Sequence, residues 1–295
     1  MPYSKKIRLS RSKSTGSKPK KPKSRMSKNK GNHARRSIRI SIPIAIGLAA
    51  AILFLIFGPI FGNREIEKAE PNDNGKGAVG SVIPRGNYKY GFDVSHYNED
   101  GIVWKDVRIL VDRKNRTTKS IKNSKDVIPV SFVVMKATEG TAYPDSKFKK
   151  FWEEAGQTDI QRGAYHFFRS GRDPEQQANF FIGTVGKLRD SDLPPILDLE
   201  TRYKGCSKAT LNERALTWLR LVGRHYGRKP IVYTSTDFVN LYLSPEITEN
   251  YQIWISDFRD QQPVINNWYV WQFTDKAVVY GVPGYVDLNV MKISR

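Results

Sequence analysis

Four carboxylates stand at or near the ends of apolar, strand-like stretches of this 295-residue sequence: Asp93, Asp198, Glu200 and Asp287. Asp198 and Glu200 are two residues apart, so on a strand both point to the same face, with Cα atoms roughly 6.5–7 Å apart. Two carboxylates in one pocket push their proton affinities apart, so one can stay an acid near neutral pH. Cleavage of a glycosidic bond needs such a pair: one proton donor and one negative group facing the developing oxocarbenium charge. A lone Asp-x-Glu triplet is also typical of a surface loop, so its surroundings must decide.

Aromatic and polar residues end several other strand-like stretches. The candidates for contact with a substrate are Tyr165, His166, Tyr233, Trp254, Trp271 and Gln272. The aromatic rings offer flat apolar walls on which sugar rings can stack, and His166 is a candidate pocket-lining residue. For any single one of these aromatic residues, packing in the core is the more frequent role, and a lone histidine is more often structural.

Other chemistries find little support in the sequence. The single cysteine, Cys206, excludes an intramolecular disulfide and a cysteine-cluster metal site. The histidine and carboxylate spacings do not resemble a metal cage, and there is neither a glycine-rich phosphate loop nor a nucleophile elbow. We therefore expect no metal and no cofactor.

The elements that must position these residues alternate between strand-like and helix-like segments. Helices are expected over residues 147–157, from Asp173 onward, and over 210–226. The eight expected strands are residues 88–95, 131–137, 162–168, 195–199, 231–234, 252–255, 268–273 and 285–289. This alternation predicts an α/β fold with a parallel sheet, closed as an irregular (β/α) barrel of TIM type. Active sites of such barrels lie at the carboxyl ends of the strands, and closure would bring Asp93 beside Asp287.

The charge of the chain is concentrated in its first part. Lys and Arg number 49 against 29 Asp and Glu, a formal charge of +20, which alone would favour a nucleic-acid or membrane-surface partner. Residues 1–39 hold 15 of the basic residues and no acid, so the rest carries only +5. This stretch is predicted to be a disordered basic tail. It remains open to nucleic-acid binding, but we expect no nucleic-acid partner.

The uncharged, apolar residues 40–63 are long enough for one transmembrane helix. The basic residues before it predict a cytoplasmic N-terminus, a single pass through the bacterial cytoplasmic (inner) membrane, lipid contact through helix and tail, and a catalytic domain outside. A cleaved signal peptide is the alternative. Residues 64–87 are predicted to be a linker and residues 88–295 the barrel domain.

Five motifs, kept in order, resemble the glycoside hydrolase family 25 lysozymes. They are Gly-Phe-Asp-Val-Ser-His-Tyr-Asn at 91–98, Val-Met-Lys-Ala-Thr-Glu-Gly at 134–140, Gly-Ala-Tyr-His-Phe at 163–167, Asp-Leu-Glu at 198–200 and Val-Asp-Leu-Asn at 286–289. The resemblance covers about residues 90–290. It implies an irregular (β/α) barrel that hydrolyses the β-1,4 bond between N-acetylmuramic acid and N-acetylglucosamine in peptidoglycan.

By this resemblance Glu200 is the general acid, and Asp198, Asp93 and Asp287 complete the carboxylate set. Glu139 joins the substrate-binding candidates, and peptidoglycan glycan strands are the expected partner. We favour substrate-assisted cleavage, with Asp198 orienting the N-acetyl group and Asp287 as second candidate. A polar, basic stretch between residues 104 and 130 is longer than the usual connection of the family and is expected to form an insertion near the first βα unit. The competing hypothesis is a non-catalytic, membrane-tethered peptidoglycan-binding module.

Overall fold

The computed structural model describes residues 79–259, 261–265 and 267–293. The predicted basic tail (1–39), the predicted transmembrane helix (40–63) and the first part of the predicted linker (64–78) lie outside the described residues. Across the part of the chain that is described, no helix combines the length and the apolar character needed to cross a bilayer.

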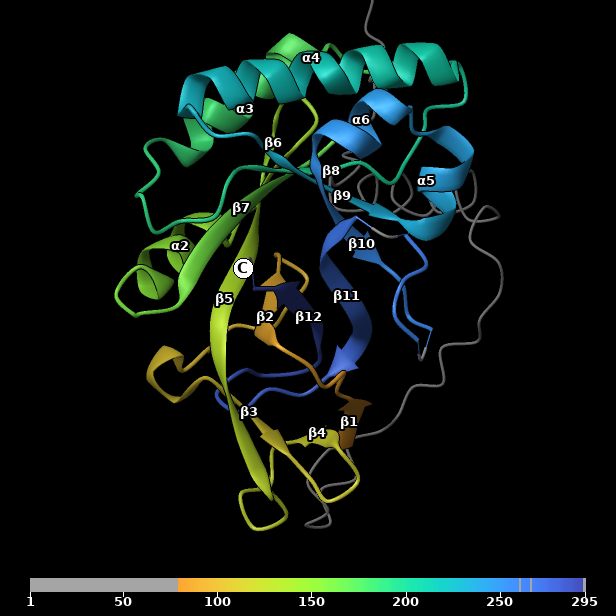
Figure 1. Cartoon of the computed structure of the whole chain (residues 1–295). Coiled ribbons are helices and arrows are strands. Elements are labelled where there is room, and N and C mark those ends of the chain that lie inside the picture. Colours follow the sequence, from red (N-terminus) through yellow and green to blue (C-terminus); the bar gives the residue numbers. More distant parts are fainter. Residues whose placement is uncertain (1–78, 260, 266, 294–295) are drawn as a thin grey trace, which may run out of the picture. The chain divides into compact units, whose positions relative to one another are not determined.

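Eight strands close into a barrel (Figure 1). They follow one another in the order β5-β2-β12-β11-β10-β9-β8-β7, and pairing of β7 with β5 closes the ring. Their bounds are β2 Tyr88–Val94, β5 Asp126–Glu139, β7 Gln161–Phe167, β8 Ile196–Asp198, β9 Ile231–Ser235, β10 Gln252–Ser256, β11 Trp268–Ala277 and β12 Val286–Lys292. Each predicted strand segment therefore contributes one barrel strand.

The direction of the last strand differs from the prediction of a parallel sheet. β12 runs antiparallel to both of its neighbours, β11 and β2, whereas the other barrel pairings are parallel. The connection from Ala277 to Val286 is the physical reason. A parallel crossover needs about a dozen residues or more, and this connection is shorter, so the chain must turn back on itself.

Five α-helices, all between β5 and β10 in the described part of the chain, cover the outside of the barrel. They are α2 Phe148–Ala155, α3 Pro174–Val185, α4 Lys208–Tyr226, α5 Thr236–Tyr242 and α6 Pro245–Asn250. Asp173 caps α3 by accepting a hydrogen bond from the backbone N–H of Gln176 (2.8 Å). The cap of α4 is Ser207, three residues before the predicted Thr210, and Gly227 ends α4 in the left-handed conformation.

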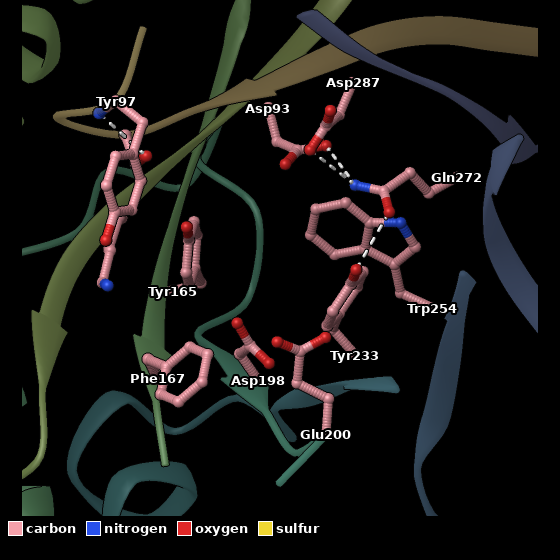
Figure 2. Close-up of a pocket in the computed structure, with 12 residues that line it drawn as sticks. Asp93, Tyr97, Tyr165, Phe167, Asp198, Glu200, Tyr233, Trp254, Gln272 and Asp287 are labelled. Carbon is pink, nitrogen blue, oxygen red and sulfur yellow. Dashed lines mark hydrogen bonds between the residues drawn. The ribbon is translucent and has the colours of Figure 1, made fainter. Parts of the chain in front are cut away.

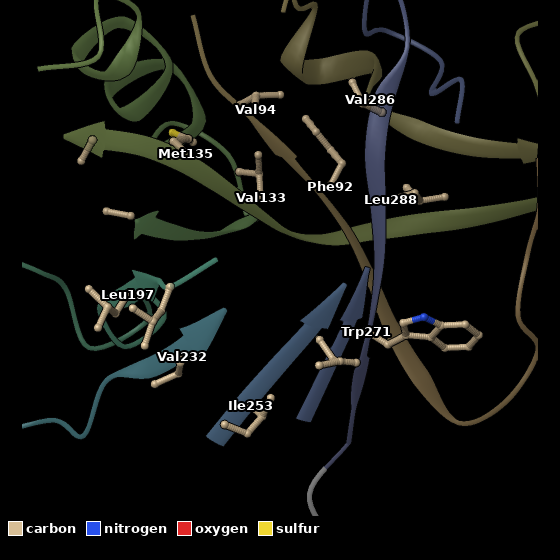
Figure 3. Packing of buried hydrophobic residues seen from close by; sticks show 14 of the residues in the cluster. Phe92, Val94, Val133, Met135, Leu197, Val232, Ile253, Trp271, Val286 and Leu288 are labelled. Carbon is tan, nitrogen blue, oxygen red and sulfur yellow. The ribbon is translucent and has the colours of Figure 1, made fainter. Parts of the chain in front are cut away.

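Buried side chains form two separate layers because strand residues alternate between the two faces. The outer layer lies between the strands and their cover, and it includes Phe92, Val133 and Leu288 (Figure 3). The inner layer fills the barrel and includes Phe132 and Val134. Successive residues of β5 thus belong to opposite layers. Along each barrel strand, residues therefore point alternately into the barrel and toward its outer cover.

A small sheet follows β2, at the place where a regular (β/α) barrel would have its first helix. It is formed by β1 Val79–Val82, β3 Arg108–Val111 and β4 Arg116–Thr118, and β3 pairs with the start of β5. Between β2 and β3 the chain forms only a short 3₁₀ helix, η1 Trp104–Asp106. Ile83 and Ile109 share the outer hydrophobic layer with Phe92. Burial of this surface stabilises the barrel wall where no helix covers it.

This sheet corrects the predicted boundary of the linker and shows what the 104–130 insertion forms. Residues 79–87 belong to the domain rather than to the linker, because β1 pairs with β4 and Ile83 is buried. The 104–130 stretch contributes to the outer cover of the barrel, and its residues are absent from the wall of the pocket described below. β6 Tyr143–Pro144 pairs with the end of β5 and completes the strands.

Candidate active site

A pocket of about 240 Å³ opens at the end of the barrel where the parallel strands finish and β12 begins (Figure 2). Its lining side chains come from all eight barrel strands and from the segments that follow β2 and β8. They are Asp93, Ser95, Tyr97, Lys136, Tyr165, Phe167, Asp198, Glu200, Tyr233, Trp254, Gln272 and Asp287. The structure therefore brings together the four predicted carboxylates with Tyr165, Tyr233, Trp254 and Gln272.

Two predicted contact residues lie outside this pocket, on the outer face of the barrel. His166 is fully buried, bonds to Thr138 and Gln177, and its ring stacks on Trp218. Its burial lowers the pKa of the imidazole to about 4, so it is neutral in the fold. Trp271 also faces outward and donates its indole N–H to a backbone carbonyl.

Strand alternation is the physical reason for both corrections. Tyr165 and Gln272 point into the pocket, so their neighbours His166 and Trp271 must point away from it. For the same reason Phe167 lines the pocket beside Tyr165.

Glu139 lies just beyond the pocket rather than in its wall. Its carboxylate accepts hydrogen bonds from Lys136 Nζ (2.7 Å) and Arg169 Nε (2.9 Å). Desolvation would raise the pKa of Glu139, but these hydrogen bonds and positive charges outweigh it, and the pKa lies below its ordinary value. Glu139 is therefore an ionised residue that fixes the two cations beside the pocket.

Asp93 and Asp287 form the first of two carboxyl pairs in the pocket. They are register partners on β2 and β12, as the sequence predicted for neighbouring first and last strands. Asn289 Nδ2 donates to Asp93 Oδ2 (2.7 Å), and Gln272 Nε2 reaches Asp93 Oδ2 (3.0 Å) and Asp287 Oδ2 (3.3 Å). Tyr233 donates its hydroxyl to Gln272 Oε1 (2.9 Å) and so holds the amide in this orientation.

The proton affinities of this pair are both raised. Desolvation raises the pKa of Asp287 to about 8, with the charge of Asp93 as the next cause. Desolvation raises the pKa of Asp93 to about 6, although hydrogen bonds from Asn289 and Gln272 oppose it. Near neutral pH the pair therefore shares one proton, which resides mainly on Asp287.

Asp198 and Glu200 form the second pair, across the pocket from the first (Figure 2). Asp198 is 7% exposed, and its Oδ1 atom is buried without a hydrogen-bond partner in the described structure. Desolvation, reinforced by the charge of Glu200, raises the pKa of Asp198 well above its ordinary value. Glu200 is exposed as a residue, but its carboxyl points into the pocket, where desolvation raises its pKa against the positive charge of Lys136 and Arg169.

Several lining residues were not singled out from the sequence: Ser95, Tyr97, Lys136 and Phe167, together with Asn289 beneath them. Lys136 carried a usable signal, because it is a lone charge inside the apolar run 132–137 and is 7% exposed in the fold. Among the described residues, no group of three or more His, Cys, Asp and Glu could hold a metal ion.

Comparison with known proteins identifies the family of the chain. The family model described as Glycosyl hydrolases family 25 matches residues 92–282. The uncharacterized protein YegX of Escherichia coli K12 is 32% identical over 210 residues, covering 70% of this chain and 71% of that protein. Lysozyme M1 of Streptomyces globisporus is 27% identical over 289 residues, covering 87% of this chain and 92% of that protein.

Solved structures resemble this chain in sequence and in fold. A family 25 glycosyl hydrolase from Bacillus anthracis is 26% identical with a TM-score of 0.57, covering 74% of this chain and 94% of that one. A bacterial lysozyme from Streptomyces coelicolor is 27% identical with a TM-score of 0.57, covering 70% of this chain and 93% of that one. The chain belongs to glycosyl hydrolase family 25.

Proposed function

We propose that this glycoside hydrolase is a lysozyme that cleaves the β-1,4 bond between N-acetylmuramic acid and N-acetylglucosamine in peptidoglycan. The observation that carries the proposal is the Asp198–Glu200 pair, which faces a second carboxyl pair across one pocket in a family 25 domain. The relatives named lysozyme support the same substrate class.

Glu200 is the proposed general acid. It lies at the mouth of the pocket, where a leaving sugar oxygen can approach it, and its raised pKa favours the protonated form that a proton donor needs. The cations Lys136 and Arg169 limit this rise, so that the carboxylate formed after donation is also stabilised.

Asp198 is the proposed orienting group for the N-acetyl group of muramic acid. Its buried Oδ1 has no partner in the described structure, and a buried acceptor without a donor is costly. An amide N–H of the substrate would supply that donor and turn the N-acetyl oxygen toward the anomeric carbon, as substrate-assisted cleavage requires.

Substrate binding would also shift a proton from Asp198 to Glu200. A hydrogen bond from the substrate N–H favours ionised Asp198 and lowers its pKa. The negative charge on Asp198 then raises the pKa of Glu200, so the proton that Asp198 releases is favoured on the general acid when the sugar is in place. Asp287 is the second candidate for the orienting role, and Asp93 with Asp287 would face the sugar from the opposite wall.

Substitution of Glu200 tests the enzymatic proposal. Glu200→Gln removes the proton donor and is expected to lower the release of reducing ends from purified peptidoglycan by about 10³. Glu213→Gln, an exposed position on α4, is the matched control and should keep full activity. Unchanged hydrolysis by Glu200→Gln would reject Glu200 as the acid. Absence of reducing ends with the unaltered chain, despite binding to the wall, would favour the non-catalytic module.

The stereochemistry tests the role of Asp198. NMR of the first-formed product should show the β anomer, because substrate-assisted cleavage retains configuration. An α anomer would exclude this mechanism and require a water attacking directly.

The membrane assignment is a separate proposal. It is supported by the 15 basic residues of 1–39 and by the uncharged stretch 40–63, which together favour a single-pass anchor with the catalytic domain outside. Cell fractionation should find the full-length chain in the cytoplasmic membrane, and protease added from outside should remove the hydrolase domain. A shorter mature chain in the soluble fraction would instead indicate a cleaved signal peptide.

A further inference from the structure

A second hollow, of about 850 Å³, lies beside the catalytic pocket. Its walls are the segments 139–143, 169–172 and 201–203, which follow β5, β7 and β8 (Figure 1). The same three strands carry Lys136, Phe167 and Asp198 of the pocket. The Phe167 ring lies 5.1 Å from Lys136 Nζ and 4.5 Å from the Arg169 guanidinium, so it stands between the two hollows. We call this second hollow the arginine cleft.

The charge of the arginine cleft is opposite to that of the pocket. Its lining includes three arginines and a single acid, Glu139, which is already paired with Lys136 and Arg169. Arg172 has no ion-pair partner among the described residues, and Arg202 donates only to a backbone carbonyl and lies near an aromatic ring. Arg172 and Arg202 therefore line the cleft without a neutralising carboxylate among the described residues, next to a pocket that holds four carboxyl groups.

The walls of the arginine cleft are held by buried contacts. Ser170 is 2% exposed; its hydroxyl accepts from the backbone N–H of Tyr203 (2.8 Å), and its carbonyl accepts from Arg214 Nη1 (2.6 Å). The Tyr203 ring rests on Gly171, where an added Cβ would come within 2.9 Å of Tyr203 Cγ. The Tyr143 and Tyr203 side chains nevertheless remain exposed. The cleft is thus formed before a ligand arrives, which reduces the entropy lost on binding.

We propose that the arginine cleft binds the carboxylates of the peptide stems that the wall glycan carries, with Arg172 and Arg202 as the binding groups. This inference rests on the proposed function. The sugars of the glycan bear no net charge except through the peptides attached to muramic acid, so two unneutralised arginines beside the sugar pocket complement the peptide and not the sugar. Guanidinium groups bind carboxylates through paired hydrogen bonds, and the exposed tyrosine faces accept the aliphatic part of a peptide.

The test compares two substrates made from one preparation of sacculi. One keeps its peptide stems, and the other is stripped of its peptides with an amidase, which leaves one lactyl carboxylate on each muramic acid in place of the peptide carboxylates. The full chain in detergent should have a higher kcat/KM on the peptide-bearing glycan. Arg172→Gln should reduce the ratio of the two kcat/KM values by about fivefold, and the double variant with Arg202→Gln by about tenfold or more.

The control variants remove exposed arginines elsewhere, Arg113→Gln and Arg224→Gln, and should leave the ratio unchanged. High salt should reduce the ratio for the unaltered chain, because the contacts are between charged groups near solvent. Equal hydrolysis of both substrates, or an equal loss on both in Arg172→Gln, would overturn the proposal while leaving the proposed function intact. A preference that disappears when wall phosphate polymers are removed, with the peptides kept, would also overturn it. Failure of the proposed function is distinguishable, because neither substrate would then be cut.

Discussion

Asp287→Asn should make the enzyme more stable, with a gain that grows with pH. Folded Asp287 keeps its proton up to about pH 8, whereas in the unfolded chain it ionises near the ordinary value of 3.8. Between these values the unfolded state binds fewer protons, so the free energy of unfolding falls as pH rises. An asparagine binds no proton in either state, which removes this slope. It also keeps an N–H toward Asp93 and an oxygen toward Gln272, as the protonated acid does.

The size of the effect follows from the shift. Each pH unit costs about 1.4 kcal/mol, so the interval from about pH 4 to pH 7 gives an upper limit near 4 kcal/mol. Because Asp93 shares the proton, we expect about half of this, roughly 2 kcal/mol, or a rise in Tm of about 4–8 °C at pH 7.

Thermal unfolding of both proteins at half-unit steps from about pH 4 to pH 8 provides the assay. The difference in Tm between variant and unaltered enzyme should be small at the acid end and increase steadily toward neutrality. Asp190→Asn, at an exposed position, controls for the loss of one acidic side chain. A variant that is less stable at pH 7, or a difference that does not change with pH, would refute the reasoning. Its hydrolytic activity should fall at the same time, as expected when a costly carboxyl is retained for function.

Three further changes test the roles of other residues. Tyr233→Phe frees the amide of Gln272 and should lower kcat/KM about tenfold without changing Tm, measured by reducing-end release; an unchanged rate would contradict the positioning role. His166→Ala should lower the free energy of unfolding by about 3 kcal/mol in denaturant titration, while the folded enzyme keeps its kcat because the ring packs outside the pocket. A loss of kcat without a loss of stability would indicate that His166 acts in catalysis. Gly91→Ala should destabilise the barrel by about 3 kcal/mol, because its Cβ would lie 2.4 Å from the carbonyl oxygen of Phe132; an unchanged unfolding midpoint would refute this.

The sequence predicted the barrel strands because their signal is local. Apolar runs and alternation mark the eight segments, and a spacing of two residues was enough to put Asp198 and Glu200 on one face. Two pairs of adjacent residues were predicted to contact the substrate, Tyr165 with His166 and Trp271 with Gln272. The same alternation rule could have excluded one member of each pair from the pocket. To decide that Tyr165, and not His166, faces inward requires the register of β7 against its neighbours, which is a property of the whole barrel.

Other features depended on information that is not local. The antiparallel direction of β12 follows from a short connection combined with closure against β2, and neither is visible in the strand itself. β1 and β4 are too short to show a pattern, and only their pairing reveals them as strands. The lone charge of Lys136 inside an apolar run marks this residue in the sequence, but only the closed barrel shows that its side chain lines a pocket.

The pairing of Asp93 with Asp287 also determines when the enzyme becomes active during its synthesis and folding. The two residues stand near opposite ends of the barrel sequence, and β2 reaches its partner β12 only when the last strand has been synthesised. Contacts between such distant segments form late in folding and slowly. A chain that has not yet formed β12 therefore lacks one wall of its own active site, so a hydrolase that acts on the wall polymer would gain activity only after this strand has been synthesised and paired.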